Sequence, residues 1–145
     1  MSLYEKYLFI RAIPKTLYFN FRYLPFKEAI RLPILISHKV FLKKVKGRVT
    51  VKKPLCFGVK IGFGDVGIFD RHLSRTIWEN SGHVIFDGKA NIGHGSKISV
   101  SGLLEIGNDF VITAESSIIC FKHVKFGDEV LISWENLITH IPHVN

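Results

Sequence analysis

Histidine is the residue type in this 145-residue chain most able to do chemistry, because an imidazole can bind a metal or move a proton near neutral pH. The seven histidines include His72, which follows Asp70 and Arg71, His94 between two glycines, and His123, His140 and His143 towards the end. Zinc needs three or four ligands, but His123 and His143 have neither a third ligand at matching spacing nor an acidic partner. We therefore expect no metal. The cluster of Asp70, Arg71 and His72 either lines a pocket or forms an ordinary loop.

Cysteine chemistry is less favoured than histidine chemistry. Cys56 and Cys120 are far apart in the sequence, which argues against a thiolate metal site and fits a reducing compartment. Cys120 lies in the apolar run from Ile118 to Phe121. We expect its side chain to be packed in the core rather than to act as a nucleophile.

The composition predicts one ordered domain. Apolar residues make up 47% of the chain and charged residues 22%, which excludes wholesale disorder. No apolar run reaches the roughly 18 residues of a membrane span. The N-terminus, with Glu5 among its aromatics, lacks the apolar core and cleavage site of a secretory signal. We expect a cytoplasmic protein.

Charge divides the chain into two segments. Residues 1–60 contain 14 Lys and Arg against two acidic residues, which gives +12, whereas residues 61–145 contain 6 against 10, which gives −4. The first segment is rich in Tyr and Phe, and the second is β-branched and punctuated by glycine. We place the boundary near Gly47, with a basic aromatic helical segment over residues 1–46 and a second structural unit over residues 47–145.

The basic segment is predicted to be helical at its start. Its apolar residues recur with the spacing of one helical face at Leu3, Tyr7 and Ile10. We expect a first helix over residues 2–12 that ends at Pro14, and a second, short helix over residues 26–32. A helical cap packed on the rest of the fold is one interpretation. An anionic membrane surface in peripheral contact with residues 1–45 is another, compatible with the first on the opposite side of the helix. Nucleic acid is not expected as a partner.

A repeat dominates the second segment. When residues 86–145 are written in three blocks of twenty, large apolar residues fall into three columns. The columns are Phe86, Ile106 and Phe126; Ile92, Ile112 and Ile132; and Ile98, Ile118 and Ile138. Within each block these positions are six apart, a spacing that falls between the turns of an α-helix. The repeat therefore indicates strands, not helices.

The period has a direct structural meaning. A strand points every second residue inward, so a spacing of six predicts three short faces per circuit, each ended by a corner. Circuits of about 20 residues would stack through parallel hydrogen bonds and align their apolar residues along one axis. Asn108 with Asp109, and Asp128 with Glu129, are expected at corners. The predicted fold is an all-β solenoid, irregular over residues 47–85 and regular over residues 86–145.

Four runs resemble the hexapeptide-repeat acyltransferases, in particular their polysaccharide-biosynthesis O-acetyltransferase branch. They are TLYFNFR at residues 16–22, IGFGDVGI at 61–68, IGHGSKI at 92–98 and FGDEVLISW at 126–134. The resemblance implies a left-handed parallel β-helix with an N-terminal helical or irregular cap, and a homotrimer. It also implies acetyl-CoA as the acyl donor, with a sugar or lipid-linked saccharide as the acceptor.

The resemblance also assigns roles to residues. A histidine near a subunit interface acts as the general base in the family, and His143, or alternatively His140, lies close to the corresponding position. Asp70, Arg71, His72 and His94 are candidates for acceptor binding, with His94 facing outward at a corner. Trp134, Val111 and Leu131 are candidates for the subunit interface.

Two further interpretations stay open. Relatives usually continue beyond the Ser-Trp pair through an acidic motif and further coils that complete the CoA groove. The residues after Trp134 lack that motif, so we expect a truncated member that is either an acyltransferase or a non-catalytic assembly module. The related γ-class carbonic anhydrases bind zinc through three histidines across a trimer interface, which makes a zinc enzyme the third possibility.

Overall fold

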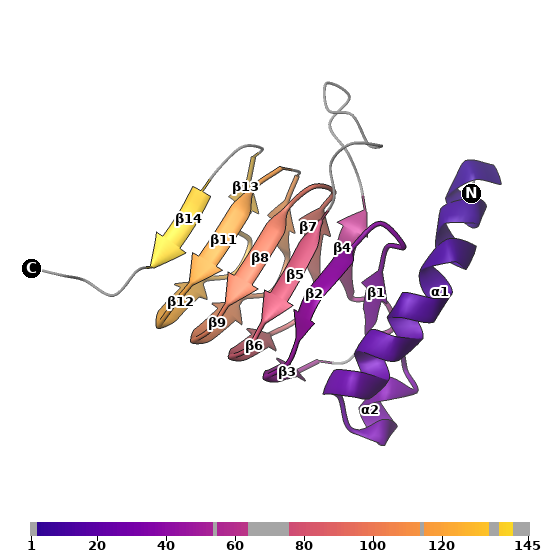
Figure 1. The fold of residues 1–145 in the computed structure, drawn as a ribbon, viewed down its shortest axis with the longest axis horizontal. Helices are drawn as coiled ribbons and strands as arrows, with labels where there is room; N and C mark the ends of the chain where they lie inside the picture. The colour runs from indigo at the N-terminus through magenta and orange to yellow at the C-terminus, as the bar shows by residue number, and fades with distance from the viewer. Residues whose placement is uncertain (1–2, 54, 64–75, 114, 134–136, 141–145) are drawn as a thin grey trace, which may run out of the picture.

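The computed structural model describes residues 3–53, 55–63, 76–113, 115–133 and 137–140, and of residues 4, 5, 8, 137, 139 and 140 the backbone only. Two helices, α1 (Leu3–Tyr23) and α2 (Phe26–Ala29), precede a series of short strands. Figure 1 shows the helices at one end of a regular stack of strands. We call this stack the solenoid.

The strands of the solenoid form three sheets. The first sheet contains β1 (Ile34–Ile36), β4 (Val59–Phe63), β7 (Ala90–Gly93), β10 (Phe110–Ile112) and β13 (Leu131–Ile132). The second contains β2 (Phe41–Val45), β5 (Ile77–Asn80), β8 (Lys97–Val100), β11 (Ser117–Cys120) and β14 (Leu137–His140). The third contains β3 (Arg48–Val51), β6 (His83–Phe86), β9 (Leu103–Ile106) and β12 (His123–Phe126).

Every pairing between these strands is parallel. Strands that follow one another in the chain belong to different sheets, and the chain returns to the first sheet after each circuit. The predicted parallel β-solenoid is therefore confirmed at this level.

The solenoid begins earlier than the charge boundary near Gly47. β1 pairs with β4 and β2 pairs with β5, so residues 34–45 build solenoid strands and do not belong to the helical segment expected over residues 1–46. The strands β3 to β6 are also in register with later ones, although the region was expected to be irregular. One register shift lies between Ile61 and Phe63. These early circuits are recognised by the pairing of their strands, because their residues do not recur at a constant interval along the chain.

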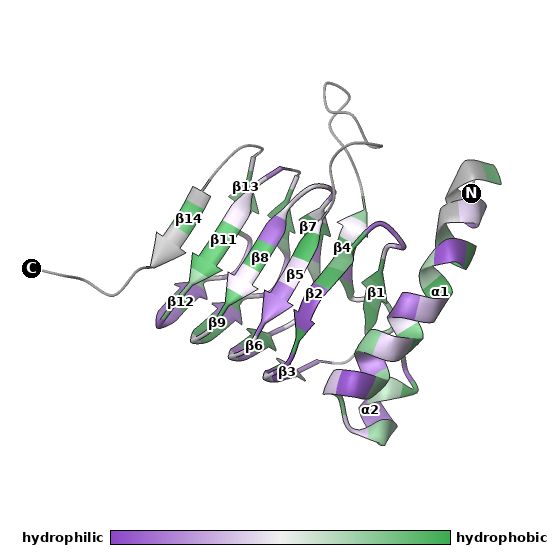
Figure 2. Ribbon diagram, in the orientation of Figure 1, coloured by the Kyte–Doolittle hydropathy of each residue, from purple (hydrophilic) through white to green (hydrophobic). Residues whose placement is uncertain are grey.

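The three apolar columns are confirmed by the strand register. Ile92 and Ile132 are both Cα partners of Ile112, and the other two columns pair in the same way. Their members point into the solenoid, where most of them are fully buried. Figure 2 shows apolar and polar residues interspersed along strands such as β2 and β8. Burial of these branched side chains, each worth about 1.5–3 kcal/mol, is the main stabilising contribution to the stack.

Helix α1 closes the end of the solenoid next to β1. Its buried face consists of Ala12, Thr16, Phe19 and Asn20. The Phe19 ring meets the fully buried indole of Trp78 edge to face, with the ring centroids 5.0 Å apart. Trp78 occupies the second-sheet position that Ile98 fills in the next circuit. The cap interpretation of the basic segment is therefore confirmed.

Two details of α1 differ from the expectation. The helix continues through Pro14 to Tyr23, and the face of Leu3, Tyr7 and Ile10 is exposed. Proline removes one N–H donor and so leaves the Ile10 carbonyl without its helical partner. Ile10 and Pro14 both lie on the solvent side of the helix, where water can donate a hydrogen bond to the Ile10 carbonyl oxygen. No helix among the described residues is both long and apolar enough to cross a membrane.

Candidate functional site

Most of the expected site residues belong to connections between the first and second sheets. We call this edge of the solenoid the histidine corner and define it by Thr76, residues 94–96 and residues 115–116. Asp70, Arg71 and His72 lie between β4 and β5, and Trp134 lies between β13 and β14. These four residues are outside the described part of the chain, so their roles stay predictions.

His94 lies at the histidine corner, directly after β7, as the sequence predicted. It was expected to face outward, but only 3% of its surface is exposed, and this expectation is wrong. The backbone explains the burial. A side chain on the preceding Gly93 would overlap the Thr113 carbonyl, so the next circuit lies directly against this turn. The N–H of Glu115 in that circuit donates to the His94 carbonyl oxygen at 3.1 Å.

Glu115 is the acidic group of the histidine corner. A Cβ on Gly95 would overlap the Glu115 Oε1 oxygen and displace the carboxylate, and the φ of +81 at this position itself favours glycine. Among the described residues this buried oxygen has no hydrogen-bond partner. Buried carboxylate oxygens are normally satisfied. The histidine corner therefore presents an acceptor oxygen withdrawn from solvent beside a buried imidazole.

Small hydroxyl residues order the backbone of the histidine corner. The Gly95 N–H donates to Thr76 Oγ1 at 2.9 Å, and the Ser116 hydroxyl donates to the Ser133 carbonyl oxygen at 2.8 Å. Thr76, Ser96 and Ser116 are all buried. Hydroxyls that bond successive circuits hold His94 and Glu115 in fixed positions.

The outer face of the first sheet brings together two of the three expected interface residues. Val111 and Leu131 are Cα partners on neighbouring strands, and Leu131 is 70% exposed. Asn91 precedes Val111 in the same row. Its buried Oδ1 oxygen has no hydrogen-bond partner within the described residues. This row combines apolar surface with a buried acceptor oxygen, and the role of Val111 and Leu131 in a subunit interface stays a prediction.

The two candidate bases lie at the far end of the chain. His140 is the last residue of β14 and the Cα partner of Cys120, whereas His143 is outside the described residues. Cys120 itself is buried, and desolvation raises the pKa of its thiol. A thiol with a raised pKa is a poor nucleophile at neutral pH. The expectation that Cys120 is a packed core residue is confirmed.

Two other histidines lie on the outer face of the third sheet. His83 Nε2 is 2.7 Å from the Thr50 hydroxyl oxygen, and His123 Nε2 is 2.7 Å from Glu105 Oε2. Desolvation lowers the pKa of His83, and the charge of Arg48 lowers it further, while Glu105 acts in the opposite direction. Leu103 separates the two histidines in the register. Across the described ranges no three metal-ligating side chains gather in one place.

Sequence reasoning missed Glu115 and His83. Glu115 stands twenty positions after Gly95, so the same repeat that aligned the apolar columns already placed it over the turn of His94. His83 lies before the regular blocks, and Thr50, its partner, lies much earlier in the chain. No sequence spacing links these two residues, because the connection between β4 and β5 separates their circuits.

Known proteins add no further identification. Comparisons with protein-family models, with curated proteins and with solved structures returned no significant match. The family of the chain is therefore not established by similarity, and its parallel solenoid with a helical cap stands on its own register and contacts.

Proposed function

We propose that this chain is an acyltransferase that moves an acetyl group from acetyl-CoA to a sugar hydroxyl during cell-surface or capsular polysaccharide biosynthesis. The proposal includes left-handed circuits of about 20 residues, a homotrimer, and a cytoplasmic location at the inner face of the membrane. One observation carries it: Ile92, Ile112 and Ile132 stack in consecutive parallel strands, as the hexapeptide-repeat resemblance requires. No metal takes part.

The proposed reaction needs one base and no covalent enzyme intermediate. His143, or His140 in its place, takes the proton of the acceptor hydroxyl while that oxygen attacks the thioester carbonyl carbon. The carbon–sulfur bond then breaks, and the CoA thiolate leaves and is protonated. The acetyl group ends as an ester on the sugar. The buried, weakly acidic Cys120 thiol has no part in this sequence.

The histidine corner supports acceptor binding. A sugar offers many hydroxyl donors, and Glu115 Oε1 is a buried acceptor oxygen without a hydrogen-bond partner among the described residues. A buried acceptor oxygen left unpaired costs about 1–3 kcal/mol, so a bound hydroxyl would recover part of that free energy. We propose that Asp70, Arg71 and His72, with His94, complete this acceptor site.

The row of half-buried Val111 and exposed Leu131 supports the subunit interface, because paired apolar side chains on a sheet face are more favourable against another subunit than in water. Trp134 follows in the next connection and would extend the contact. The active site would then form between subunits, with the base of one chain facing the acceptor site of its neighbour.

The activity is tested by thiol release. The full chain is incubated with acetyl-CoA and a panel of sugars and nucleotide-linked sugars, and free CoA is measured with a thiol reagent. We expect release only with an acceptor, and a loss of about 100-fold or more in the His143→Ala or the His140→Ala variant. The matched control is His123→Ala, since His123 is exposed on the third sheet and bonded to Glu105.

Each alternative predicts another result. No release with any acceptor, from a chain that forms a trimer, supports the non-catalytic assembly module and overturns the enzyme proposal. Stoichiometric zinc that stays bound through purification supports the zinc enzyme. Equal losses in His123→Ala and in both candidate bases mean that neither base acts in the reaction.

A further inference from the structure

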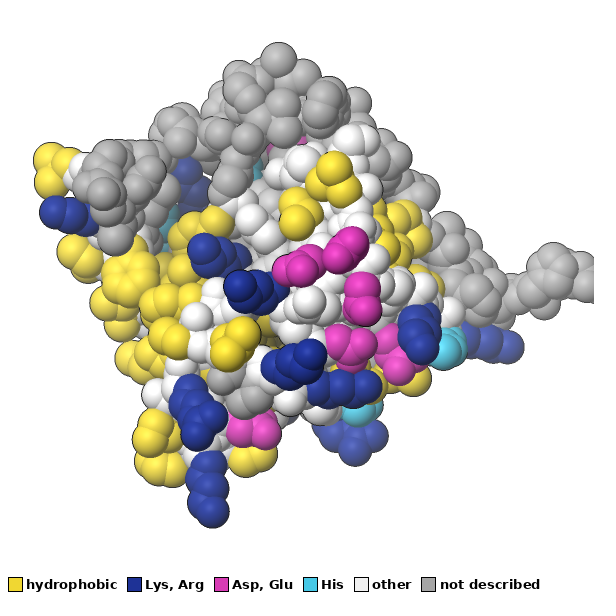
Figure 3. Space-filling view, turned by 180° about the vertical axis from the view of Figure 1, so that it is seen from behind, with side chains coloured by type: hydrophobic (Ala, Val, Ile, Leu, Met, Phe, Trp, Pro, Cys, Tyr) yellow, Lys and Arg dark blue, Asp and Glu magenta, His cyan; other side chains and the backbone are white. Residues whose placement is uncertain are grey.

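Helix α1 carries an apolar surface that nothing in the described structure covers. Its exposed apolar side chains lie opposite the face that packs on β1, and those of α2 continue the surface. We call this surface the outer stripe; it consists of Leu3, Tyr7, Ile10, Ile13, Leu17, Tyr18, Phe21, Phe26 and Ile30. Leu3 is 85% exposed, Ile10 63% and Phe26 70%. Figure 3 shows hydrophobic side chains gathered at the side of the molecule that the helices occupy. An exposed apolar surface of this extent marks an interaction site.

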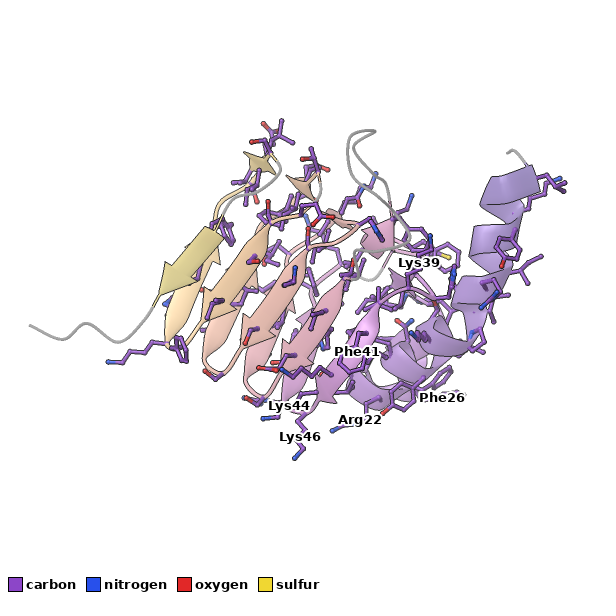
Figure 4. All side chains as sticks on the ribbon, turned by 45° about the horizontal axis from the view of Figure 1, so that its top comes forward. Arg22, Phe26, Lys39, Phe41, Lys44 and Lys46 are labelled. Carbon is purple, nitrogen blue, oxygen red and sulfur yellow. The ribbon has the colours of Figure 1, made fainter. Side chains whose placement is uncertain are left out.

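Basic residues border the outer stripe on one side. Arg11 and Arg22 are eleven residues apart in α1, which places them on the same flank of a helix with 3.6 residues per turn. Arg22 lies against the Tyr23 ring, with its guanidinium carbon 5.5 Å from the ring centroid. Lys44 in strand β2 and Lys46, directly after the strand, are also exposed. Figure 4 shows Arg22, Lys44 and Lys46 at the same end of the molecule as Phe26. We call these four cations the basic shoulder.

The outer stripe is held in place from its opposite side. The Thr16 hydroxyl and the Asn20 side-chain amide bond to the backbone of β1, and the Lys15 ammonium donates to the carbonyl oxygens of His38 and Val40. The helix is thus already formed and oriented. Its 21 residues extend about 30 Å at 1.5 Å per residue. Binding to the outer stripe would require no folding step.

We propose that the outer stripe and the basic shoulder form a docking surface for a bilayer that contains anionic lipid. In this arrangement α1 lies in the plane of the interface, its apolar side chains enter the acyl boundary, and the cations of the shoulder meet lipid phosphates. The charge complementarity extends beyond the shoulder, because residues 1–60 carry +12 with Glu5 and Glu28 as their acidic residues. The solenoid would stand on the membrane through its cap.

Other occupants fit the surface less well. A second copy that packed its own outer stripe here would also bring two basic shoulders together, which like charges oppose. A nucleic acid would use the cations but would leave the apolar stripe in water. The bilayer uses both features at once. This inference is independent of the proposed acetyl transfer, and its test needs no acetyl-CoA.

Vesicle binding tests the docking surface directly. The full chain is sedimented with vesicles of phosphatidylcholine alone or mixed with phosphatidylglycerol. We expect strong binding to the mixed vesicles, weak binding to phosphatidylcholine, and weaker binding as salt is raised. The double variant Ile10→Ser/Leu17→Ser should bind at least about tenfold more weakly. Lys44→Gln/Lys46→Gln should lose about fivefold for each charge.

Matched controls lie on the solenoid. Phe121→Ser removes an exposed apolar side chain and Lys125→Gln an exposed charge, both away from the cap, and both variants should bind like the parent chain. Far-ultraviolet circular dichroism confirms that each variant is folded. A Phe21→Trp variant should show a blue-shifted emission component on mixed vesicles, because the new indole would enter the acyl boundary.

Several results would overturn the proposal. They are an absence of vesicle binding, equal binding to both vesicle types, and equal losses in the control variants. Self-association that disappears in Ile10→Ser/Leu17→Ser, without vesicle binding by the parent chain, would assign the outer stripe to a second copy.

Discussion

Asn20 shows how one side chain can substitute for a neighbouring strand. Its side-chain amide N–H donates to the Ile34 carbonyl oxygen at 2.7 Å, and its Oδ1 accepts the Ile34 N–H at 3.1 Å. The amide also donates to the Thr16 carbonyl at 2.7 Å. Asn20 is fully buried. Its two bonds to Ile34 therefore replace the bonds that a strand outside β1 would make, and the third holds the side chain to its own helix.

Removal of this amide should be costly. In Asn20→Ala the N–H and carbonyl of Ile34 stay buried without partners, at about 1–3 kcal/mol for each group. We expect the free energy of unfolding to fall by about 2–4 kcal/mol, measured by urea denaturation. Asn91→Ala is the matched control, because Asn91 Oδ1 has no partner to lose among the described residues. Equal losses in the two variants would contradict this account of the cap.

The sequence predicted the positions of some single residues correctly and of others incorrectly. Cys120 was placed correctly in the core because its apolar neighbours are local in the chain. His94 was placed at the correct corner but on the wrong side, because its burial depends on a circuit that arrives twenty residues later. The effect of Pro14 was also misjudged. Ala12 and Thr16, on either side of Pro14 in the chain, are buried against the solenoid and hold α1 in place. The spacing of apolar residues in the sequence does not reveal such contacts.

Among the elements, the corners between the third and first sheets set the distance between circuits. Asp109 and Glu129 occupy positive φ there, in the positions that the repeat predicted for corner residues. Gly107 precedes this turn, and a Cβ on it would overlap the Gly127 carbonyl. Gly127 holds the equivalent place in the next circuit, and no described atom lies within 4 Å of a Cβ built there.

This pair of glycines gives a matched test. Gly107→Ala should lower the free energy of unfolding by about 2 kcal/mol, because the added methyl group forces two circuits apart. Gly127→Ala should leave stability unchanged or raise it by about 0.5 kcal/mol, because alanine restricts the unfolded chain. Thermal unfolding followed by circular dichroism measures both. A larger loss in Gly127→Ala would show that contact between circuits does not decide the glycine requirement.

Regular elements were predictable where the repeat is uninterrupted. The columns of Ile92 and Ile98 follow from a constant spacing, and the structure keeps them in register. β1 and β2 were assigned to the helical segment because they lie outside the repeat. Val59 pairs with both Ile34 and Ala90, partners at unequal distances in the chain. Sequence spacing cannot reveal such pairs, since the connections differ in length while the strands still match.

For the whole molecule, acid should be destabilising. Desolvation lowers the pKa of His38 and of His83, and nearby cations lower both further. The unfolded state then binds protons first as the pH falls through about 6.5, so stability declines below that pH. Hydrogen bonds from Lys43 and Ser99 lower the pKa of the Glu79 carboxyl group. These bonds stabilise the fold at a pH above the ordinary pKa of glutamate. Their contribution is lost as the pH falls to the lowered pKa of Glu79 and the carboxylate is protonated.

Urea denaturation at a series of pH values checks this prediction. The free energy of unfolding should be highest near neutral pH and should decrease steadily on acidification. His83→Gln should make the decrease below about pH 6.5, the ordinary pKa of histidine, smaller. The part that comes from His38 and the decrease at lower pH should remain. A parent chain that gains stability as the pH falls from 7 to 5 would contradict the assigned pKa directions.

The molecule as a whole was predicted in outline. The solenoid, the helical cap and the charge asymmetry between the two segments follow from periodicity and composition. The histidine corner could not be completed from sequence, because the relation between His94 and Glu115 depends on how closely two circuits approach each other. The outer stripe could not be located either. The pattern identified the apolar face of Leu3 and Ile10, but only the fold shows that this face points away from the solenoid.

The cap also bears on polymerisation. A bare edge strand is a template on which another chain can add a strand, and β1 lies at the edge of the first sheet. Thr16 and Asn20 occupy the outward N–H and carbonyl groups of Ile34 and Ile36. Because they do so with side chains, the helix presents no new ladder of its own. Strand addition is therefore blocked at this edge of the first sheet.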